Sequence, residues 1–230
     1  PLRLVGSEMC IRDSTNISLP ALTEKDVEDA IFAIKQDVDW IALSFVRHKQ
    51  DVEDLRKLIQ EHGKYDIPII SKIEKPEALV NIKEIVKASN ALMVARGDLG
   101  VEVPAEEVPI VQKELVQHAK LARIPVIVAT QMMESMIDGL TPTRAEVNDV
   151  ANSVMDGADA VMLSGETSVG KYPVEVIQTM RRIVVSVENS PLIHMPYKAP
   201  KKKNARFVTK SVCYHAATTV SYTHLRAHET

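Results

Sequence analysis

The sequence predicts an α/β fold in which helices cover a parallel sheet. Five short apolar runs alternate with five amphipathic segments along most of the chain. The apolar runs consist mainly of Val, Ile, Leu and Met without polar alternation, which is typical of strands that are buried on both faces. A doubly wound sheet and part of a (β/α)8 barrel both have this pattern, and hydrophobic periodicity does not distinguish them.

The elements are placed by run length and by helical spacing of apolar residues. A first helix is expected to begin at Thr23, because Thr23 and Asp26 have the spacing of a capping box. The expected strands are Trp40–Val46, Ile67–Ile73, Ala91–Ala95, Pro125–Thr130 and Asp159–Leu163. The helices that follow them are expected at Asp51–His62, Pro76–Lys87, about Glu107–Ala122, Thr143–Met155 and Pro173–Asn189.

The composition excludes several classes of function. The 230 residues are 45% apolar and carry a net charge of -3, which suits a sizeable core but would not attract nucleic acid or an anionic membrane. No apolar run approaches the ~20 residues of a membrane span. The two cysteines lie far apart in the sequence, so we predict no disulfide framework and expect a cytoplasmic location. None of the seven histidines has the ligand spacing of a structural zinc site.

The chain divides into a main domain and several shorter segments. Residues 1–14 and 220–230 differ in character from the rest and look non-native, so they do not enter the fold prediction. Residues 15–190 contain the strand–helix units. Three prolines and three successive lysines predict a solvated linker over 191–204. Residues 205–219 are expected to begin a C-terminal α/β domain.

Charged residues follow two neighbouring apolar runs where the strands are expected to end. Alternation along a strand places Lys72 and Glu74 on the same side. The next run ends in Arg96-Gly97-Asp98-Leu99-Gly100, which predicts a glycine loop that carries a carboxylate. Glu74 and Asp98 would supply two of the oxygen ligands that Mg²⁺ prefers. The alternative interpretations are a plain Lys–Glu ion pair and a solvated turn.

Smaller polar side chains follow the remaining runs. The hydroxyl of Thr130 could bind a ligand beside the N–H groups of a helix that begins there, or it could cap that helix. Ser164 could relay a proton or cap the next turn. The residues from Ser44 to Arg47 could line the same site.

Several motifs closely resemble those of the pyruvate kinase family. They are LPALTEKD (Leu19–Asp26), ISKIE (Ile70–Glu74), MVARGDLGVEVP (Met93–Pro104), ATQMMESM (Ala129–Met136) and the run from Pro142 to Pro173. The resemblance covers nearly all of Thr15–Thr219. It implies a (β/α)8 (TIM) barrel, of which this chain would hold the last five strand–helix units over 15–190, and the start of the C-terminal domain.

The resemblance also implies a reaction and the residues that serve it. The reaction is phosphoryl transfer from phosphoenolpyruvate to ADP, giving pyruvate and ATP, with Mg²⁺ and K⁺ as cofactors. Lys72 would be catalytic, Glu74 and Asp98 would hold Mg²⁺, and Gly97, Asp98 and Thr130 would bind the substrate. The potassium ligands would lie outside this chain, and the parent protein would be a cytoplasmic homotetramer. Two alternatives stay open: an Mg²⁺-dependent enolpyruvate aldolase or lyase, and a non-catalytic binding or assembly fragment.

Overall fold

The computed structural model describes residues 22–63, 66–190 and 207–227. Within them, five strands form one sheet in which every neighbouring pair is parallel. The strands are β1 (Ile41–Leu43), β2 (Ile69–Ile73), β3 (Ala91–Ala95), β4 (Val126–Ala129) and β5 (Ala160–Met162). The prediction of a parallel α/β sheet is confirmed.

The helices that accompany this sheet alternate with the strands along the chain. They are α2 (Glu24–Lys35), α3 (Lys49–His62), α4 (Pro76–Val80), α5 (Ile82–Ala88), α6 (Arg96–Glu102), α7 (Val108–Ala122), α8 (Arg144–Asp156), α9 (Gly165–Ser168) and α10 (Pro173–Glu188), with a short 3-10 helix, η1 (Glu134–Ile137). Local signals fix several of their first residues. Thr23 and Thr143 cap α2 and α8, each in a complete capping box. Proline occupies the first position of α4 and of α10.

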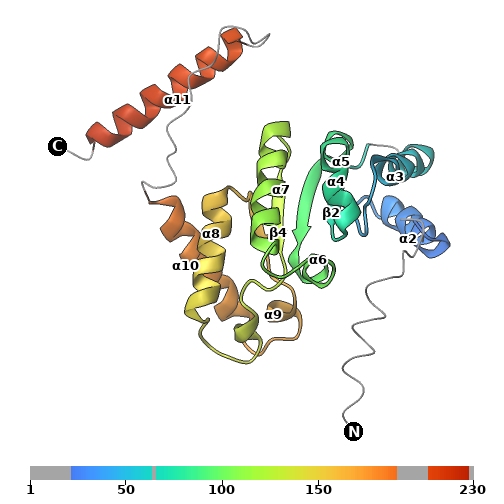
Figure 1. Ribbon diagram of the computed structural model, residues 1–230, viewed down its shortest axis with the longest axis horizontal. Helices are drawn as coiled ribbons and strands as arrows, with labels where there is room; N and C mark the ends of the chain where they lie inside the picture. Colours follow the sequence, from blue (N-terminus) through green and yellow to red (C-terminus); the bar gives the residue numbers. More distant parts are fainter. Residues whose placement is uncertain (1–21, 64–65, 191–206, 228–230) are drawn as a thin grey trace. The chain divides into compact units, whose positions relative to one another are not determined.

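The strand order distinguishes between the two folds that fit the sequence pattern. A doubly wound sheet reverses its strand order and carries helices on both faces. Here the order is β1-β2-β3-β4-β5, so each strand pairs with the next one in the chain. Successive helices also contact one another, in the pairs α2–α3, α3–α5, α5–α7 and α7–α8, and so form one layer beside the sheet (Figure 1). This is the arrangement of part of a (β/α)8 barrel.

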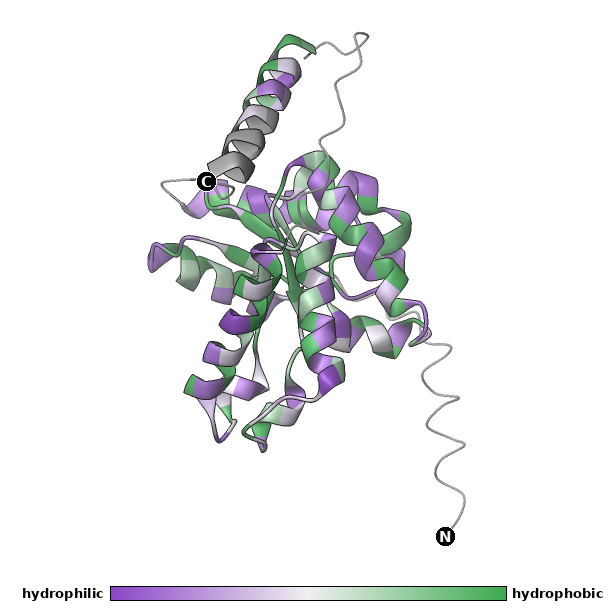
Figure 2. Ribbon diagram, turned by 90° about the vertical axis from the view of Figure 1, so that its left-hand side faces the viewer, coloured by the Kyte–Doolittle hydropathy of each residue, from purple (hydrophilic) through white to green (hydrophobic). Residues whose placement is uncertain are grey.

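The hydrophobic core lies between the sheet and this layer of helices. All five residues of β3 are buried, and α3 buries Val52, Leu55 and Ile59 on one face. Figure 2 shows hydrophobic residues along the central strands, while the helices alternate between hydrophobic and hydrophilic residues. Full burial of one such aliphatic side chain contributes about 1.5–3 kcal/mol. The core therefore holds the strand ends, and the polar residues that follow them, in a fixed arrangement.

Most element ends shift by one or two residues, and two expected elements differ more from those in the structure. The expected strand Trp40–Val46 is shorter, since β1 ends at Leu43 and the positive φ of 55° at Phe45 turns the chain away from the sheet. The expected helix Pro76–Lys87 is divided into α4 and α5 at Asn81, whose φ of -97° and ψ of 7° interrupt the helix. The Asn81 amide donates to the carbonyl oxygen of Arg47 at 3.1 Å. This contact with the turn after β1 therefore competes with continuation of the helix through Asn81.

The glycine loop expected at Arg96–Gly100 is instead a helix. Helix α6 begins directly after β3 and includes Gly97 and Gly100, neither of which has a positive φ. Gly97 is a point of close approach, because a Cβ atom there would lie 3.3 Å from Thr130 Oγ1. The glycine makes room for a side chain of the neighbouring unit rather than for a left-handed turn.

A second compact part of the chain begins at Glu188 and contains helix α11 (Phe207–Ala227). This helix covers most of the segment 205–219, where we expected a C-terminal domain to begin, and part of the expected tail, 220–230. The expected leader, 1–14, and the expected linker, 191–204, lie outside the described residues. None of the helices in the described ranges is long and apolar enough to cross a membrane.

Candidate active site

A charged pair at the end of β2 is tied to the end of β1. Lys72 Nζ lies 2.7 Å from Glu74 Oε1 and donates to Ser44 Oγ at 2.8 Å. Glu74 is only 1% exposed, and its Oε2 accepts the backbone N–H of Phe45 at 2.6 Å. The two charges therefore lie on the same side of the chain, as alternation predicts. Because charge-assisted hydrogen bonds are short and directional, they hold the ammonium group in one place.

Asp98 lies at the same end of the sheet, in the neighbouring unit. The register pairs Ile73 with Val94, so the chain after β2 and the start of α6 emerge at similar levels. Lys75 Nζ pairs with Glu102 Oε1 at 2.6 Å and ties the turn after Glu74 to the end of α6. The Asp98 side chain is exposed and has no hydrogen-bond or ion-pair partner among the residues that the structure describes. Joint metal binding by Glu74 and Asp98 stays a prediction.

Thr130 directly follows β4, at the same end of the sheet as Glu74 and Asp98. Its Oγ1 accepts the N–H of Gly97 at 2.7 Å and donates to the carbonyl oxygen of the preceding residue at 2.6 Å. The structure thus brings two of the predicted substrate-binding residues into direct contact. Thr130 does not cap a helix, because η1 begins only at Glu134, with Met133 as its N-cap.

The chain after β4 follows an uncommon backbone path that a buried arginine supports. Thr130 and Gln131 have positive φ values of 68° and 53°, a region that costs a non-glycine residue about 1–3 kcal/mol. Arg96 Nη2 donates to the carbonyl oxygens of Thr130 at 2.7 Å and of Gln131 at 3.1 Å. Arg96 Nη1 donates to both carboxylate oxygens of Asp149, each at 2.7 Å. The guanidinium, in a residue only 7% exposed, is thereby neutralised and held against the turn.

Two carboxylates hold the rest of the segment after β4. Glu166 is 3% exposed and accepts the N–H groups of Met133 at 3.1 Å and of Ser164 at 2.7 Å, so it joins the ends of β4 and β5. Glu146 of α8 accepts the N–H of Ser135 at 2.7 Å. Partial burial acts to raise the pKa of Glu146, but hydrogen bonds from Ser135 and from the capping threonine outweigh it and lower the pKa below 4.5. Charged groups of three helices therefore fix this segment.

The two carboxylates predicted to hold a metal ion, Glu74 and Asp98, would not form a closed cage by themselves. No group of three or more His, Cys, Asp or Glu side chains converges within the described ranges. Mg²⁺ is nevertheless bound through one or two carboxylates, with water and substrate oxygens as its other ligands. Each oxygen of Glu74 makes one contact and has a further lone pair, and the Asp98 carboxylate is exposed. This donor set fits Mg²⁺.

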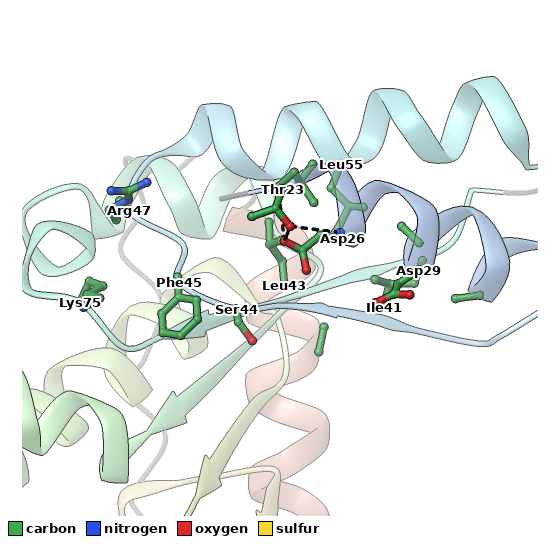
Figure 3. Close-up of a pocket in the computed structure, with 14 residues that line it drawn as sticks. Thr23, Asp26, Asp29, Ile41, Leu43, Ser44, Phe45, Arg47, Leu55 and Lys75 are labelled. Carbon is green, nitrogen blue, oxygen red and sulfur yellow. Dashed lines mark hydrogen bonds between the residues drawn. The ribbon is translucent and has the colours of Figure 1, made fainter. Parts of the chain in front are cut away.

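A pocket of about 620 Å³ adjoins the site beside β1 (Figure 3). Helix α2, β1 and the turn after β1 form most of its lining. Ser44 and Phe45, which contact Lys72 and Glu74, belong to this lining, as does Arg47. The residues after β1 that we expected near the site are therefore there. β1 pairs only with β2 in the described sheet, so the pocket lies at the open edge.

The residues that support the site are harder to find from sequence than those that face it. A charge directly after five apolar residues predicts a buried cation that needs a partner, and Arg96 has that pattern. Its partner, Asp149, lies 53 residues further along the chain, beyond the reach of any local rule. Ser164, expected as a proton relay or cap, is the N-cap residue of α9 but makes no side-chain capping bond.

Comparisons with known proteins show similarity to one family. The family model described as pyruvate kinase, barrel domain, matches residues 7–177, so the match begins inside the segment 1–14. Pyruvate kinase of Mycobacterium intracellulare is 57% identical over 186 residues, and that of Corynebacterium glutamicum is 58% identical over 185 residues. Both alignments cover 79% of this chain and 39% of the relative. Pyruvate kinase 2 of Synechocystis is 46% identical over 202 residues, which cover 88% of this chain and 34% of the relative.

These comparisons bear on the interpretations that the residues left open. The chain spans about two fifths of the length of the curated relatives it matches first, with 39% of each covered. All of them are named pyruvate kinase, which does not favour the aldolase or lyase alternative. The matched region contains all five strands of the parallel sheet, in agreement with part of a (β/α)8 barrel. The chain belongs to the pyruvate kinase family.

Proposed function

We propose that the protein containing this chain transfers the phosphoryl group of phosphoenolpyruvate to ADP, as in glycolysis, and that protonation of the resulting enolate gives pyruvate. One observation supports this reaction most directly. At the C-terminal ends of β2, β3 and β4 lie a lysine paired with a buried carboxylate, an exposed aspartate and a threonine hydroxyl, all at the same end of the sheet. Phosphoryl transfer requires mainly positioning and charge stabilisation, and these groups can supply both.

Lys72 is the group that would stabilise negative charge on the phosphoryl group. An ammonium group has three N–H donors. Ser44 and Glu74 accept two of them, so within the described chain the third is left for a phosphoryl oxygen. Because both contacts exist before substrate binds, little reorganisation is needed when charge shifts during transfer.

Gly97, Asp98 and Thr130 would contact the substrate. The Gly97 N–H donates to Thr130 Oγ1 in this structure. To bind the substrate carboxylate, as the family resemblance implies, this N–H must share or exchange that bond. The direct contact means that a substrate bound by either residue also affects the other.

Glu74 and Asp98 would hold Mg²⁺. When bound, the ion supplies neutralisation of negative charge on phosphate and enol oxygens. Glu74 would then have a second role, because the same carboxylate orients Lys72. K⁺ is also expected from the family resemblance, with ligands outside this chain.

We further infer a cytoplasmic homotetramer whose partners are phosphoenolpyruvate and ADP or ATP. The family resemblance supports this inference. The net charge of -3 gives no support for a nucleic-acid or membrane partner.

The test uses the complete protein with phosphoenolpyruvate, ADP, Mg²⁺ and K⁺. Pyruvate is measured through lactate dehydrogenase and ATP through luciferase, and carbon–carbon cleavage products are assayed in parallel. We expect equal amounts of pyruvate and ATP, a large loss in Lys72→Ala, and no loss in Lys113→Ala, whose exposed side chain pairs with Asp156 away from the site. Cleavage products without ATP would contradict the proposal and favour the aldolase or lyase.

A further inference from the structure

The segment that presents Thr130 is held from one side by a single guanidinium group. Arg96 is the first residue of α6, and it is 7% exposed although it carries a charge. Its Nη2 donates to the carbonyl oxygens of Thr130 and Gln131, at 2.7 and 3.1 Å, and its Nε donates to the same Thr130 oxygen at 3.2 Å. The group thus binds the backbone of two successive residues, both of which have positive φ.

This backbone conformation needs outside support. A β-branched residue at positive φ is uncommon and persists where the surrounding structure holds it. The Arg96 contacts go to the carbonyl groups of the two left-handed residues themselves, so they act directly on the strained part of the turn. A planar guanidinium can reach both oxygens at once, whereas an ammonium group is a compact point charge without that fork.

Arg96 is itself fixed by two outer helices. Asp149 of α8 accepts two hydrogen bonds from Nη1, and the Gln112 side chain of α7 accepts a third at 3.3 Å. The residue after Arg96 contributes as well, since the Gly97 N–H binds the Thr130 hydroxyl. Two successive residues of α6 therefore determine the backbone and the side chain of the same threonine.

We propose that Arg96 is the positioning residue for Thr130: it selects the left-handed turn that directs the threonine hydroxyl toward the substrate. This inference rests on the proposed function, in which Thr130 contacts substrate. Arg96 acts through Thr130 and not on the substrate, because the N–H groups of its guanidinium are engaged with the turn and with Asp149. Glu166 and Glu146 hold Met133 and Ser135 independently, so loss of Arg96 releases the first part of the segment only.

The experiment is a double-variant cycle in the complete protein. Arg96→Lys, Thr130→Ala and the double variant are compared by kcat and by KM for phosphoenolpyruvate. We expect Arg96→Lys to lower kcat/KM about 10–100-fold, the size expected for a misplaced substrate contact, with the same division between kcat and KM as Thr130→Ala. In the Thr130→Ala background, Arg96→Lys should add less than about a twofold loss, because coupled residues are not additive.

A second measurement does not depend on activity. The methyl resonance of Thr130 is observed in threonine-labelled protein and assigned by its absence in Thr130→Ser. Arg96→Lys should shift or broaden it. Lys113→Gln, which breaks a different ion pair between α7 and α8, should leave it unchanged. If Arg96→Lys does not fold, Asp149→Asn, which keeps the guanidinium but removes its counter-charge, takes its place in both measurements.

The outcomes separate the two proposals. If the parent protein forms no pyruvate, the proposed function is wrong, and the methyl resonance alone decides whether Arg96 positions Thr130. If the parent is active, equal fold-losses from Arg96→Lys in both backgrounds, with an unchanged Thr130 resonance, overturn the role of Arg96.

Discussion

Replacement of Lys72 by alanine tests the central pair of the site. The change removes the partner of a carboxylate that is 1% exposed and leaves Glu74 with the Phe45 N–H as its contact in the described chain. Breaking a fully buried pair in this way costs about 3–5 kcal/mol. The Lys72 side chain is 25% exposed, so water can reach the vacated side of Glu74. We therefore expect a smaller loss of unfolding free energy, about 1–3 kcal/mol.

The effect on catalysis should be larger than the effect on folding. Removal of one preorganised donor from the transition state typically lowers kcat by about 10²–10³-fold, and Lys72→Ala in the complete protein should fall in this range. The assay measures pyruvate through lactate dehydrogenase across a range of phosphoenolpyruvate concentrations. Thermal unfolding of the same samples shows that the variant is folded at the assay temperature.

The division of the loss between kcat and KM decides the role of Lys72. A charge that acts mainly during transfer lowers kcat with little change in KM. A rise in KM alone would show that Lys72 binds the ground state instead, and would refute the reasoning. Lys113→Ala serves as the control, because it removes a lysine–carboxylate pair whose lysine side chain is exposed.

Three further predictions follow from other parts of the site. Gly97→Ala should lower kcat/KM about tenfold, because its Cβ would lie 3.3 Å from Thr130 Oγ1 and a small displacement of a substrate contact is costly. The control is Gly100→Ala in the same helix, whose Cβ would lie 3.7 Å from Val108 and which should leave activity unchanged. An equal loss of activity in both variants would contradict this account. Glu146→Gln should lower the unfolding free energy by about 1 kcal/mol at neutral pH. Since folding lowers the pKa of Glu146, its contribution is present above pH 4.5 and is lost as pH falls through the folded-state pKa, so a difference in denaturant unfolding that does not decrease as pH is lowered from 7 past the folded-state pKa would argue against it. Expressed alone, the chain should self-associate and form no pyruvate. The reason is that β1 and β5 each have one strand partner in the described sheet, and that the side chains of Phe32, Trp40 and Phe45 are exposed. Light scattering that shows a compact monomer, together with turnover, would disprove this.

The sequence predicts the parts of the fold that depend on local signals. The strand Ala91–Ala95 lies where five successive apolar residues placed it. The capping boxes at Thr23 and Thr143 set the first residues of α2 and α8. Strand order has no such local signal, because it depends on contacts between strand–helix units. The hydrophobic pattern allowed two folds, and the resemblance of the motifs to a known family selected the right one.

The errors arise where a distant contact overrides a local preference. Phe45 lies in an apolar run that favours a strand, yet its N–H binds Glu74 and its φ is positive. Glycines on either side of Asp98 favour a loop, but the buried position of Arg96 begins a helix there. The side chains that face the site, Lys72 and Glu74, follow from alternation along one strand. Asp149, which supports Arg96, comes from another strand–helix unit and has no local signature.

Every contact that shapes the site joins adjacent units or lies within one of them, and this has a consequence for recombination between family members. Ser44 and Phe45 depend on the unit of β2, whereas Thr130 depends on the unit of β3 through Gly97 and Arg96. Among the residues that the structure describes, the side-chain contact of the site that joins these two groups is the Lys75–Glu102 pair near the surface. A chimera with its breakpoint in α4 or α5 should therefore inherit each half of the site intact. A breakpoint within α7 would instead take Arg96 from one parent and Asp149, with the turn that Arg96 holds, from the other, so such chimeras should lose activity where the two parents differ at these contacts.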